Sequence, residues 1–189
     1  MTLIVTGLFL LHLHTDRTLE KKLCRYPVLV GVSYIVSFVL LGMEGSVHGD
    51  PIIILKLWKY ANLRHERIEQ YIIRNEEGKI DGVWGAKSDF SYSFKPWENN
   101  HTEGIYLAGV ECVEDAEPPR GWDKWIMPGY EYIKVECVED DNLFNEMTFN
   151  EAMQYFDENS IEVIASVQEY TDLKTRKNYL LFPIKELKD

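Results

Sequence analysis

Two stretches of the chain carry apolar side chains at the spacing of one helical face. In the first, side chains of one face recur three and four residues apart, at Ile54, Leu57, Trp58, Ala61, His65 and Ile68. Asp50 and Pro51 precede them and suit a helix N-cap and a first helical position. In the second, Thr148 and Glu151 have the spacing of a capping box, and the apolar stripe is Phe149, Ala152, Met153 and Phe156. We therefore predict one helix from about Pro51 and another from about Thr148.

Apolar runs on either side of each helix predict strands. One run within residues 27–42 precedes the first helix, and the runs Val83–Phe90 and Gly104–Val113 follow it. The second helix is preceded by Tyr130–Val138 and followed by Ile161–Tyr170 and Tyr179–Leu187. The order strand–helix–strand–strand thus occurs twice, which predicts an α+β fold with an antiparallel sheet and both helices on one of its faces.

These elements divide the chain into two halves. We expect half one at 26–115, a proline- and glycine-containing linker at 116–129, and half two at 130–187. Residues 1–25 form an N-terminal extension of uncertain order, too short and too apolar for a helix-turn-helix segment. Its run MTLIVTGLFLLHL lacks the basic region and cleavage site of a secretory signal. No apolar run of the chain is long enough for a membrane span, so we expect no membrane partner.

Composition narrows the class of protein. The 189 residues are 46% hydrophobic and 13% aromatic, which describes a globular chain with a full core. The formal net charge of −11 argues against nucleic-acid binding, because phosphate contacts require clustered Lys and Arg. The same charge either keeps the protein soluble or favours cationic ligands. Three cysteines without a CxxC pair fit a reducing cytoplasm.

The string VECVED occurs at 110–115 and again at 135–140. The two copies do not occupy equivalent positions in the two halves, so they are not the repeated unit. Each copy offers one cysteine, Cys112 or Cys137, without a histidine or second cysteine at ligand spacing, so both cysteines are better explained as buried small hydrophobes. Cys24, and His12 with His14, likewise lack the further ligands that a metal needs. We expect no metal and no cofactor, since there is also no glycine-rich phosphate loop.

Aromatic residues outside the helical stripes point to a binding cleft. Trp84, Trp122 and Trp125 lie on or beside predicted strands and the linker. Ser166, Gln168 and Tyr170 share one strand face, opposite Val163, Ala165 and Val167. If the valine face packs on the helices, the Gln168 and Tyr170 face either lines a cleft or covers a solvated side of the sheet.

Several short strings, taken in order, resemble a known family. MPGYEY at 127–132 resembles the entry to the first strand of the family's second half, and SVQEY at 166–170 its Phe-Glu-x-Tyr strand. LFPI at 181–184 resembles its closing strand, and YLAGVECV at 106–113 the strand before its linker. Over residues 26–187 the chain thus resembles the GyrI-like small-molecule-binding family, which is also the effector-binding domain of AraC- and MerR-type bacterial transcription regulators.

The resemblance implies a central cleft between pseudo-symmetric halves, lined by aromatic rings and often by a buried acidic residue that attracts lipophilic cations. Matching Phe-Glu-x-Tyr onto 167–170 puts Gln168 where the family carries Glu, and alternation points Glu169 to the helix-facing side. A neutral or hydrogen-bonding ligand is then expected. Some relatives are hydrolases that use this glutamate as a general base, a role that a glutamine cannot fill.

The leading hypothesis is a stand-alone, cytoplasmic small-molecule-binding protein that serves as a sensor, a sequestering protein or a modulator of a partner protein. Its ligand would be aromatic or lipophilic, and the residues expected to line the cleft are Trp84, Trp125, Tyr132, Gln168 and Tyr170. One alternative is a hydrolase of the same fold that uses Glu169 or Glu136, which requires the acid to aim into the cleft. Another is an acidic inhibitor that binds a macromolecular target. The oligomeric state is left open.

Overall fold

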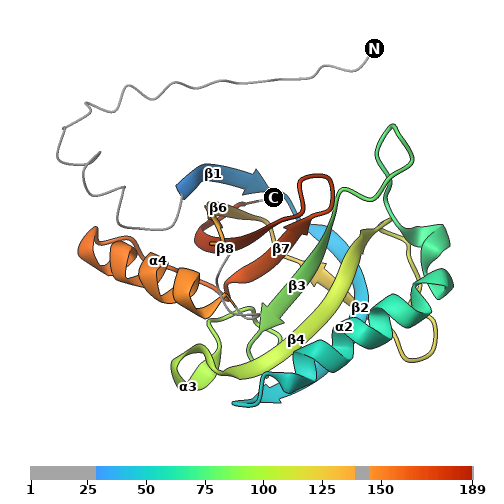
Figure 1. The fold of residues 1–189 in the computed structure, drawn as a ribbon, viewed down its shortest axis with the longest axis horizontal. Coiled ribbons are helices and arrows are strands. Elements are labelled where there is room, and N and C mark those ends of the chain that lie inside the picture. Colours follow the sequence, from blue (N-terminus) through green and yellow to red (C-terminus); the bar gives the residue numbers. More distant parts are fainter. Residues whose placement is uncertain (1–28, 139–144, 189) are drawn as a thin grey trace.

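The computed structural model describes residues 29–138 and 145–188. Within these residues, eight strands form one antiparallel sheet in the order β1-β6-β8-β7-β3-β4-β2-β5, and the sheet curls into a half-barrel (Figure 1). The strands are β1 (Leu29–Ile35), β2 (Phe38–His48), β3 (Gly82–Ser88), β4 (Glu103–Cys112), β5 (Asp123–Met127), β6 (Tyr130–Glu136), β7 (Gln168–Asp172) and β8 (Lys177–Glu186). The helices are α2 (Ile52–Arg64), the short 3-10 turns η1 (His65–Arg67) and η2 (Glu69–Tyr71), α3 (Glu98–His101) and α4 (Glu146–Glu158). The predicted extension at 1–25, with His12, His14 and Cys24, lies outside the described residues.

The duplication predicted from the sequence is confirmed. The element orders β2-α2-β3-β4 and β6-α4-β7-β8 repeat, and β3 pairs with β7 where the two units meet. The strand preceding each unit crosses to the other one, since β1 pairs with β6 and β5 pairs with β2. The strand order therefore stays the same when the two units are exchanged, which is the mark of a pseudo-two-fold axis between β3 and β7. The segment predicted as a linker contains β5, so it adds an edge strand to the sheet.

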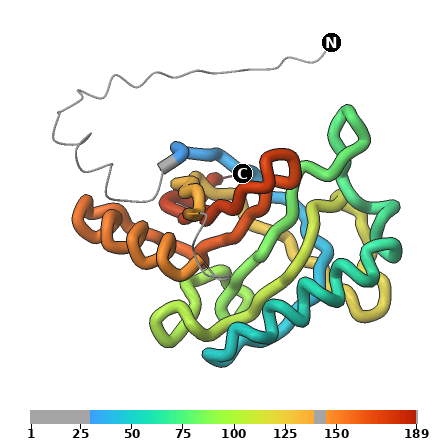
Figure 2. The backbone as a smooth tube through the Cα atoms, viewed as in Figure 1, coloured from blue at the N-terminus to red at the C-terminus, as the bar shows by residue number. Residues whose placement is uncertain are grey.

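Both helices lie on the same face of the sheet. Tyr106 of β4 pairs with Lys87 of β3, and Gly85 of β3 pairs with Glu169 of β7. Glu169 pairs in turn with Leu180 of β8, and Leu180 with Val135 of β6, so the side chains at these positions share one face. The buried residues of α2 (Ile54, Leu57 and Ala61) pack with Leu41, Tyr106 and Ala108. Those of α4 (Ala152 and Phe156) pack with Ile133, Val135 and Phe182. In the backbone trace the two helices flank the central strands, α4 on one side and α2 on the other (Figure 2).

The opposite face of the sheet is filled by a second core. Its buried members include Leu40, Trp84, Ala86, Leu107, Trp125, Met127 and Tyr132. The loop after β3 covers this cluster with the side chains of Phe90 and Phe94. The backbone N–H of Ser166 donates to the carbonyl of Phe94 at 2.7 Å, which ties the loop to the chain just before β7. The face away from the helices is therefore packed with side chains.

Local hydrogen bonds explain where the elements begin. Asp50 Oδ1 accepts the N–H of Ile52 at 3.0 Å, so α2 starts where the sequence predicts. The predicted capping box at Thr148 is wrong, because α4 begins at Glu146 and Thr148 is buried inside it, where its Oγ1 accepts the N–H of Val138 at 3.2 Å. The predicted strand Ile161–Tyr170 forms only from Gln168 onward. Upstream, the N–H of Ile164 bonds to Pro183 and that of Ser166 to the covering loop, so no ladder with β3 forms there.

The first VECVED copy, at 110–115, lies within the described residues, whereas the second, at 135–140, runs beyond them at its last two positions. Cys112 is buried and Cys137 is half-buried, and within 29–138 and 145–188 no three His, Cys, Asp or Glu side chains are grouped so that they could hold a metal ion. Burial raises the pKa of the Cys112 thiol to about 11, which keeps it protonated and unreactive at neutral pH. In the same part of the chain, none of the helices combines the length and apolar character that crossing a membrane requires.

Candidate functional site

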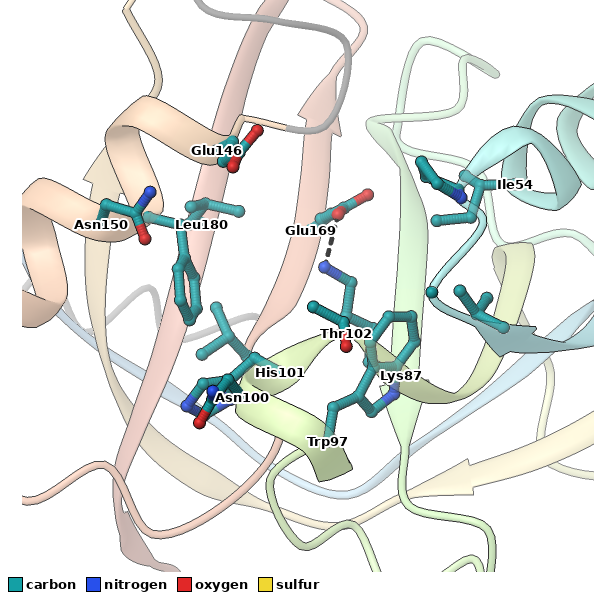
Figure 3. Close-up of a pocket in the computed structure, with 15 residues that line it drawn as sticks. Ile54, Lys87, Trp97, Asn100, His101, Thr102, Glu146, Asn150, Glu169 and Leu180 are labelled. Atoms are coloured by element: carbon teal, nitrogen blue, oxygen red, sulfur yellow. Dashed lines mark ion pairs between the residues drawn. The ribbon is translucent and has the colours of Figure 1, made fainter.

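Of two cavities that the described residues line on the helix-bearing face of the sheet, the larger lies between α2 and α4 and has a volume of ≈ 290 Å³ (Figure 3). The two halves both contribute to it. The start of α2, the end of β3 and the α3 turn come from the first half, and the first turn of α4 with Val167, Glu169 and Leu180 from the second. A cavity between the halves is the position that the resemblance predicts for the cleft.

Glu169 forms the polar centre of this cavity. Its Oε1 lies 2.7 Å from Lys87 Nζ, and its Oε2 accepts a hydrogen bond from the Tyr106 hydroxyl, also at 2.7 Å (Figure 3 marks the ion pair). The Tyr106 oxygen in turn accepts a hydrogen bond from Trp58 Nε1 at 3.0 Å. The side chains of Lys87 and Glu169 are 17% and 18% exposed, so the pair is mostly withdrawn from water. Both oxygens of the carboxylate are thus held by donors that arrive from β3 and β4.

A glycine makes this arrangement possible. Gly85 is paired with Glu169 across the β3–β7 ladder, and a Cβ built on it would lie 2.0 Å from the Tyr106 oxygen and 2.6 Å from Glu169 Oε2. Any larger residue would occupy the space in which the phenol meets the carboxylate. The absence of a side chain at position 85 therefore positions the hydrogen bond.

Burial sets the protonation of two rings near the carboxylate. The pKa of the Tyr106 hydroxyl is well above its usual range, first because the ring is fully buried and then because Glu169 lies beside it. Tyr106 is therefore a donor at every physiological pH. Burial, and then the charge of Lys87, lower the pKa of His101, so this imidazole is neutral at pH 7 and adds no positive charge to the cavity wall.

Aromatic rings form the walls. The ammonium of Lys87 lies 5.1 Å from the centroid of the Trp97 ring, a cation–π contact. Trp97 is fixed by a hydrogen bond from its Nε1 to the carbonyl of Ile105 at 3.2 Å. On the other side the rings of His101 and Phe149 are 5.2 Å apart and bring the α3 turn against α4. The cavity thus offers apolar surfaces around one carboxylate–ammonium pair.

A smaller cavity of ≈ 180 Å³ lies on the other side of Glu169. It shares Ile54 and Glu169 with the larger one and is also lined by Trp58, Tyr170 and Asn178. Glu169 therefore stands between two hollows on the same face of the sheet.

Three of the five residues predicted to line a cleft lie in the core on the opposite face. Trp84, Trp125 and Tyr132 are buried there, and Trp84 packs against Tyr170 with ring centroids 4.9 Å apart. Trp125 Nε1 donates to Glu44 Oε2 at 2.8 Å. These rings are aromatic and close together, as the sequence analysis expects, but they contact one another and the covering loop.

Gln168 is 1% exposed, and its amide is fully used within the sheet. Its Oε1 accepts the N–H of Lys87 at 2.7 Å, and its Nε2 donates to the carbonyls of Lys87 and Ser166 at 3.1 and 2.7 Å. The side chain thereby continues the β3–β7 ladder beyond its last backbone pair. Neither Gln168 nor the three rings of the far core line either of these two cavities, whereas Tyr170 lines the smaller one. A ligand-contacting role for these five residues stays a prediction.

Sequence reasoning missed four cavity residues, Lys87, Trp97, His101 and Phe149. It also missed Tyr106, whose hydroxyl donates to Glu169. Strand alternation does place Glu169 on the helix-facing side, and the structure confirms that direction. The helix-facing side is also the side that holds the cavity. Alternation together with the pairing of the predicted strands Val83–Phe90 and Gly104–Val113 could have found Lys87 and Tyr106, since these two are register neighbours on the same face.

Comparison with known proteins places the fold. No protein-family profile matches the chain, and no curated protein matches it in sequence. Among solved structures, SAV2435 bound to tetraphenylphosphonium is similar with a TM-score of 0.57 at 12% identity, over 82% of this chain and 93% of that one. An integron cassette protein from the mobile metagenome of Vibrio cholerae gives 0.56 at 15% identity, over 85% and 98%.

The same fold occurs in EcmrR, which has been solved in a complex with DNA. The C-terminal domain of EcmrR gives a TM-score of 0.56 at 12% identity, over 83% of this chain and 97% of the domain. In the EcmrR–DNA complex the TM-score is 0.61 at 9% identity, over 92% of this chain and 63% of EcmrR. The chain therefore has the fold of the GyrI-like effector-binding domains, and one of its structural neighbours, SAV2435, is bound to tetraphenylphosphonium.

Proposed function

We propose that this protein binds an aromatic or lipophilic small molecule in the larger cavity between α2 and α4, and acts through that binding as a sensor, a sequestering protein or a modulator of a partner protein. The cavity itself supports this most strongly, since it combines the rings of Trp97 and Phe149 with a largely desolvated carboxylate–ammonium pair. Its ≈ 290 Å³ is near the lower end of ligand sites, which suits a molecule of about one or two fused rings.

The position of Glu169 supports the same assignment. The resemblance implies a buried acidic residue in the cleft. Glu169 lines the larger cavity and lies one position after the residue that the sequence match selects, which supports the proposal. The tetraphenylphosphonium that is bound to SAV2435 is both aromatic and lipophilic. A structural neighbour of this fold therefore holds a ligand with both properties.

The proposal includes a cytoplasmic location and no direct contact with nucleic acid. The net charge of −11 would repel phosphate, and EcmrR's match to this chain lies in its C-terminal domain. Any regulatory effect would then pass through a protein partner.

Blocking the cavity tests the proposal. Val167 lines it, so Val167→Phe should fill part of the space, whereas Val113→Phe adds the same ring at a position that is 38% exposed and lines neither cavity. With 1-methyl-2-quinolone as a probe in isothermal titration, we expect wild type and Val113→Phe to bind equally, and Val167→Phe at least about tenfold more weakly. Equal binding by all three, or no binding by wild type at millimolar probe, would contradict the proposal.

A hydrolase is the second candidate, because Glu169 aims into the cavity as that alternative requires. A carboxylate next to a bound electrophile could take a proton from an attacking water. The test is mass spectrometry of a cyclopropane-containing aromatic electrophile incubated with wild type and with Glu169→Gln. Addition of water by wild type alone would favour the hydrolase, and identical product levels would exclude Glu169 as its base.

A further inference from the structure

Lys87 places a positive charge inside the cavity at the point where a cationic ligand would be held. A desolvated cation is best stabilised by a carboxylate together with an aromatic ring face. Here the ammonium of Lys87 has both, with Glu169 Oε1 at 2.7 Å and the Trp97 ring centroid at 5.1 Å. The protein thus supplies its own cation to the carboxylate.

The lysine is fixed at both ends. Its backbone N–H and carbonyl are paired with the Gln168 amide on one side of the sheet, and its ammonium with Glu169 on the other. Reorientation of the side chain would leave the mostly desolvated carboxylate of Glu169 without its cationic partner, which is costly. An incoming cation therefore meets either a neutralised carboxylate or a like charge.

The ammonium also has donor capacity left for a ligand. A lysine carries three N–H donors, and within residues 29–138 and 145–188 the carboxylate of Glu169 is its sole hydrogen-bonding partner. Lys87 lines the cavity, as do the neutral His101 and the carboxylate of Glu169. A full anion would be repelled by Glu169, whereas an uncharged oxygen or nitrogen acceptor would not.

We propose that Lys87 is the specificity-determining residue of the cavity: it excludes lipophilic cations and selects neutral aromatic ligands that present a hydrogen-bond acceptor to its ammonium. This inference rests on the proposed function, since it names the ligand class of the same site. It also predicts that a cation site is latent, with Glu169 and Trp97 in place, and becomes available when the ammonium is removed.

The test compares two probes of similar shape, the cation N-methylquinolinium and the neutral 1-methyl-2-quinolone, by isothermal titration. Wild type should prefer the quinolone. Lys87→Met keeps an unbranched apolar stem and should bind the cation about tenfold or more tightly than wild type does, while losing affinity for the quinolone. Adding Glu169→Gln to Lys87→Met should abolish the gain for the cation.

Lys134→Met is the matched control. Lys134 is also an ammonium over an aromatic ring, 3.8 Å from the Tyr179 centroid, and its removal changes the net charge equally, but it does not line the larger cavity. It should leave both affinities at the wild-type values. Lys87→Gln gives a second variant with the same expected direction, and thermal unfolding of each protein confirms that it is folded.

The outcomes separate the two claims. If wild type binds the quinolone but Lys87→Met and Lys87→Gln show no gain for the cation, or if wild type prefers the cation, the role of Lys87 is wrong while the proposed function stands. If neither probe binds any of the folded proteins, the proposed function fails and the role of Lys87 with it.

Discussion

The side-chain amide of Gln168 is hydrogen-bonded to the backbone of Lys87 as a neighbouring strand would be, through an acceptor contact of 2.7 Å and a donor contact of 3.1 Å. The next residue, Glu169, points to the other face and takes the ammonium of the same lysine. Two consecutive residues of β7 thereby hold one residue of β3 at both ends. The first contact belongs to the sheet, and the second belongs to the cavity.

Replacing Gln168 by glutamate should destabilise the fold. A carboxylate cannot donate to the carbonyls of Lys87 and Ser166, and it would be buried without a cationic partner. We expect a loss of about 2–4 kcal/mol in the free energy of unfolding, measured by urea denaturation at pH 7. Gln70→Glu makes the same exchange at an exposed position and should stay within about 0.5 kcal/mol of wild type. A Gln168→Glu protein as stable as wild type would show that the amide donors do not matter.

Two glycines of β3 distinguish the faces of the sheet. A Cβ at Gly85 would meet the Tyr106 oxygen at 2.0 Å, and a Cβ at Gly82 would meet the Tyr170 ring at 2.3 Å. Gly85→Ala should therefore displace the phenol from Glu169 and weaken binding of 1-methyl-2-quinolone, by about tenfold. Gly82→Ala should disturb the far face and leave the affinity of the folded protein near wild type. The reverse pattern in titrations of both variants would place the ligand beside Tyr170.

Asp89 gives the stability a dependence on acid pH. Burial acts to raise the pKa of its carboxyl, but hydrogen bonds from Ser91 and Ser93 outweigh burial and bring the pKa down to about 2. In an unfolded chain the pKa of this carboxyl is about 4, so the ionised Asp89 stabilises the folded state above that pH. The stabilisation is lost as the pH falls toward about 2.

Between those pH values the free energy of unfolding should fall in both proteins, but by about 1–2 kcal/mol more in wild type than in Asp89→Asn, with solvent screening included. Urea titrations at pH 4.5 and 2.5 measure the difference. Asp115→Asn, at an exposed turn, should keep the full wild-type loss. Equal losses in wild type and Asp89→Asn would show that the loop anchor does not contribute.

The fold could be predicted because its signals are local. The helical stripe of Ile54, Leu57 and Ala61 and the strand alternation of Tyr130–Val138 specify their elements without knowledge of distant partners. β5 was missed because prolines and glycines surround it, and because its pairing with β2 depends on residues far away in the sequence. Thr148 was misassigned because a capping box and a buried helical threonine look alike in one dimension.

The site was harder to predict because both faces of this sheet are buried. The sequence showed aromatic residues on the Gln168 face, and the structure shows that they form a core there, closed by the loop after β3. Glu169 was recognised as facing the helices, yet a helix-covered face usually has no space for a ligand. Here α2 and α4 lie on the same face but flank the central strands, one to either side, which leaves space between them. That separation depends on tertiary packing, which no local sequence pattern reports.

Fluorine NMR of the protein labelled with 5-fluorotryptophan tests the central claim, that the ligand binds on the helix-bearing face beside Glu169. The chain has five tryptophans, so single Trp→Phe variants can assign each resonance. Trp97 and Trp58 line the two cavities, whereas Trp84 and Trp125 lie in the core of the far face. On titration with 1-methyl-2-quinolone, the resonance of Trp97 should shift most and those of Trp84 and Trp125 should stay in place. Shifts of Trp84 and Trp125 with an unmoved Trp97 would contradict the account.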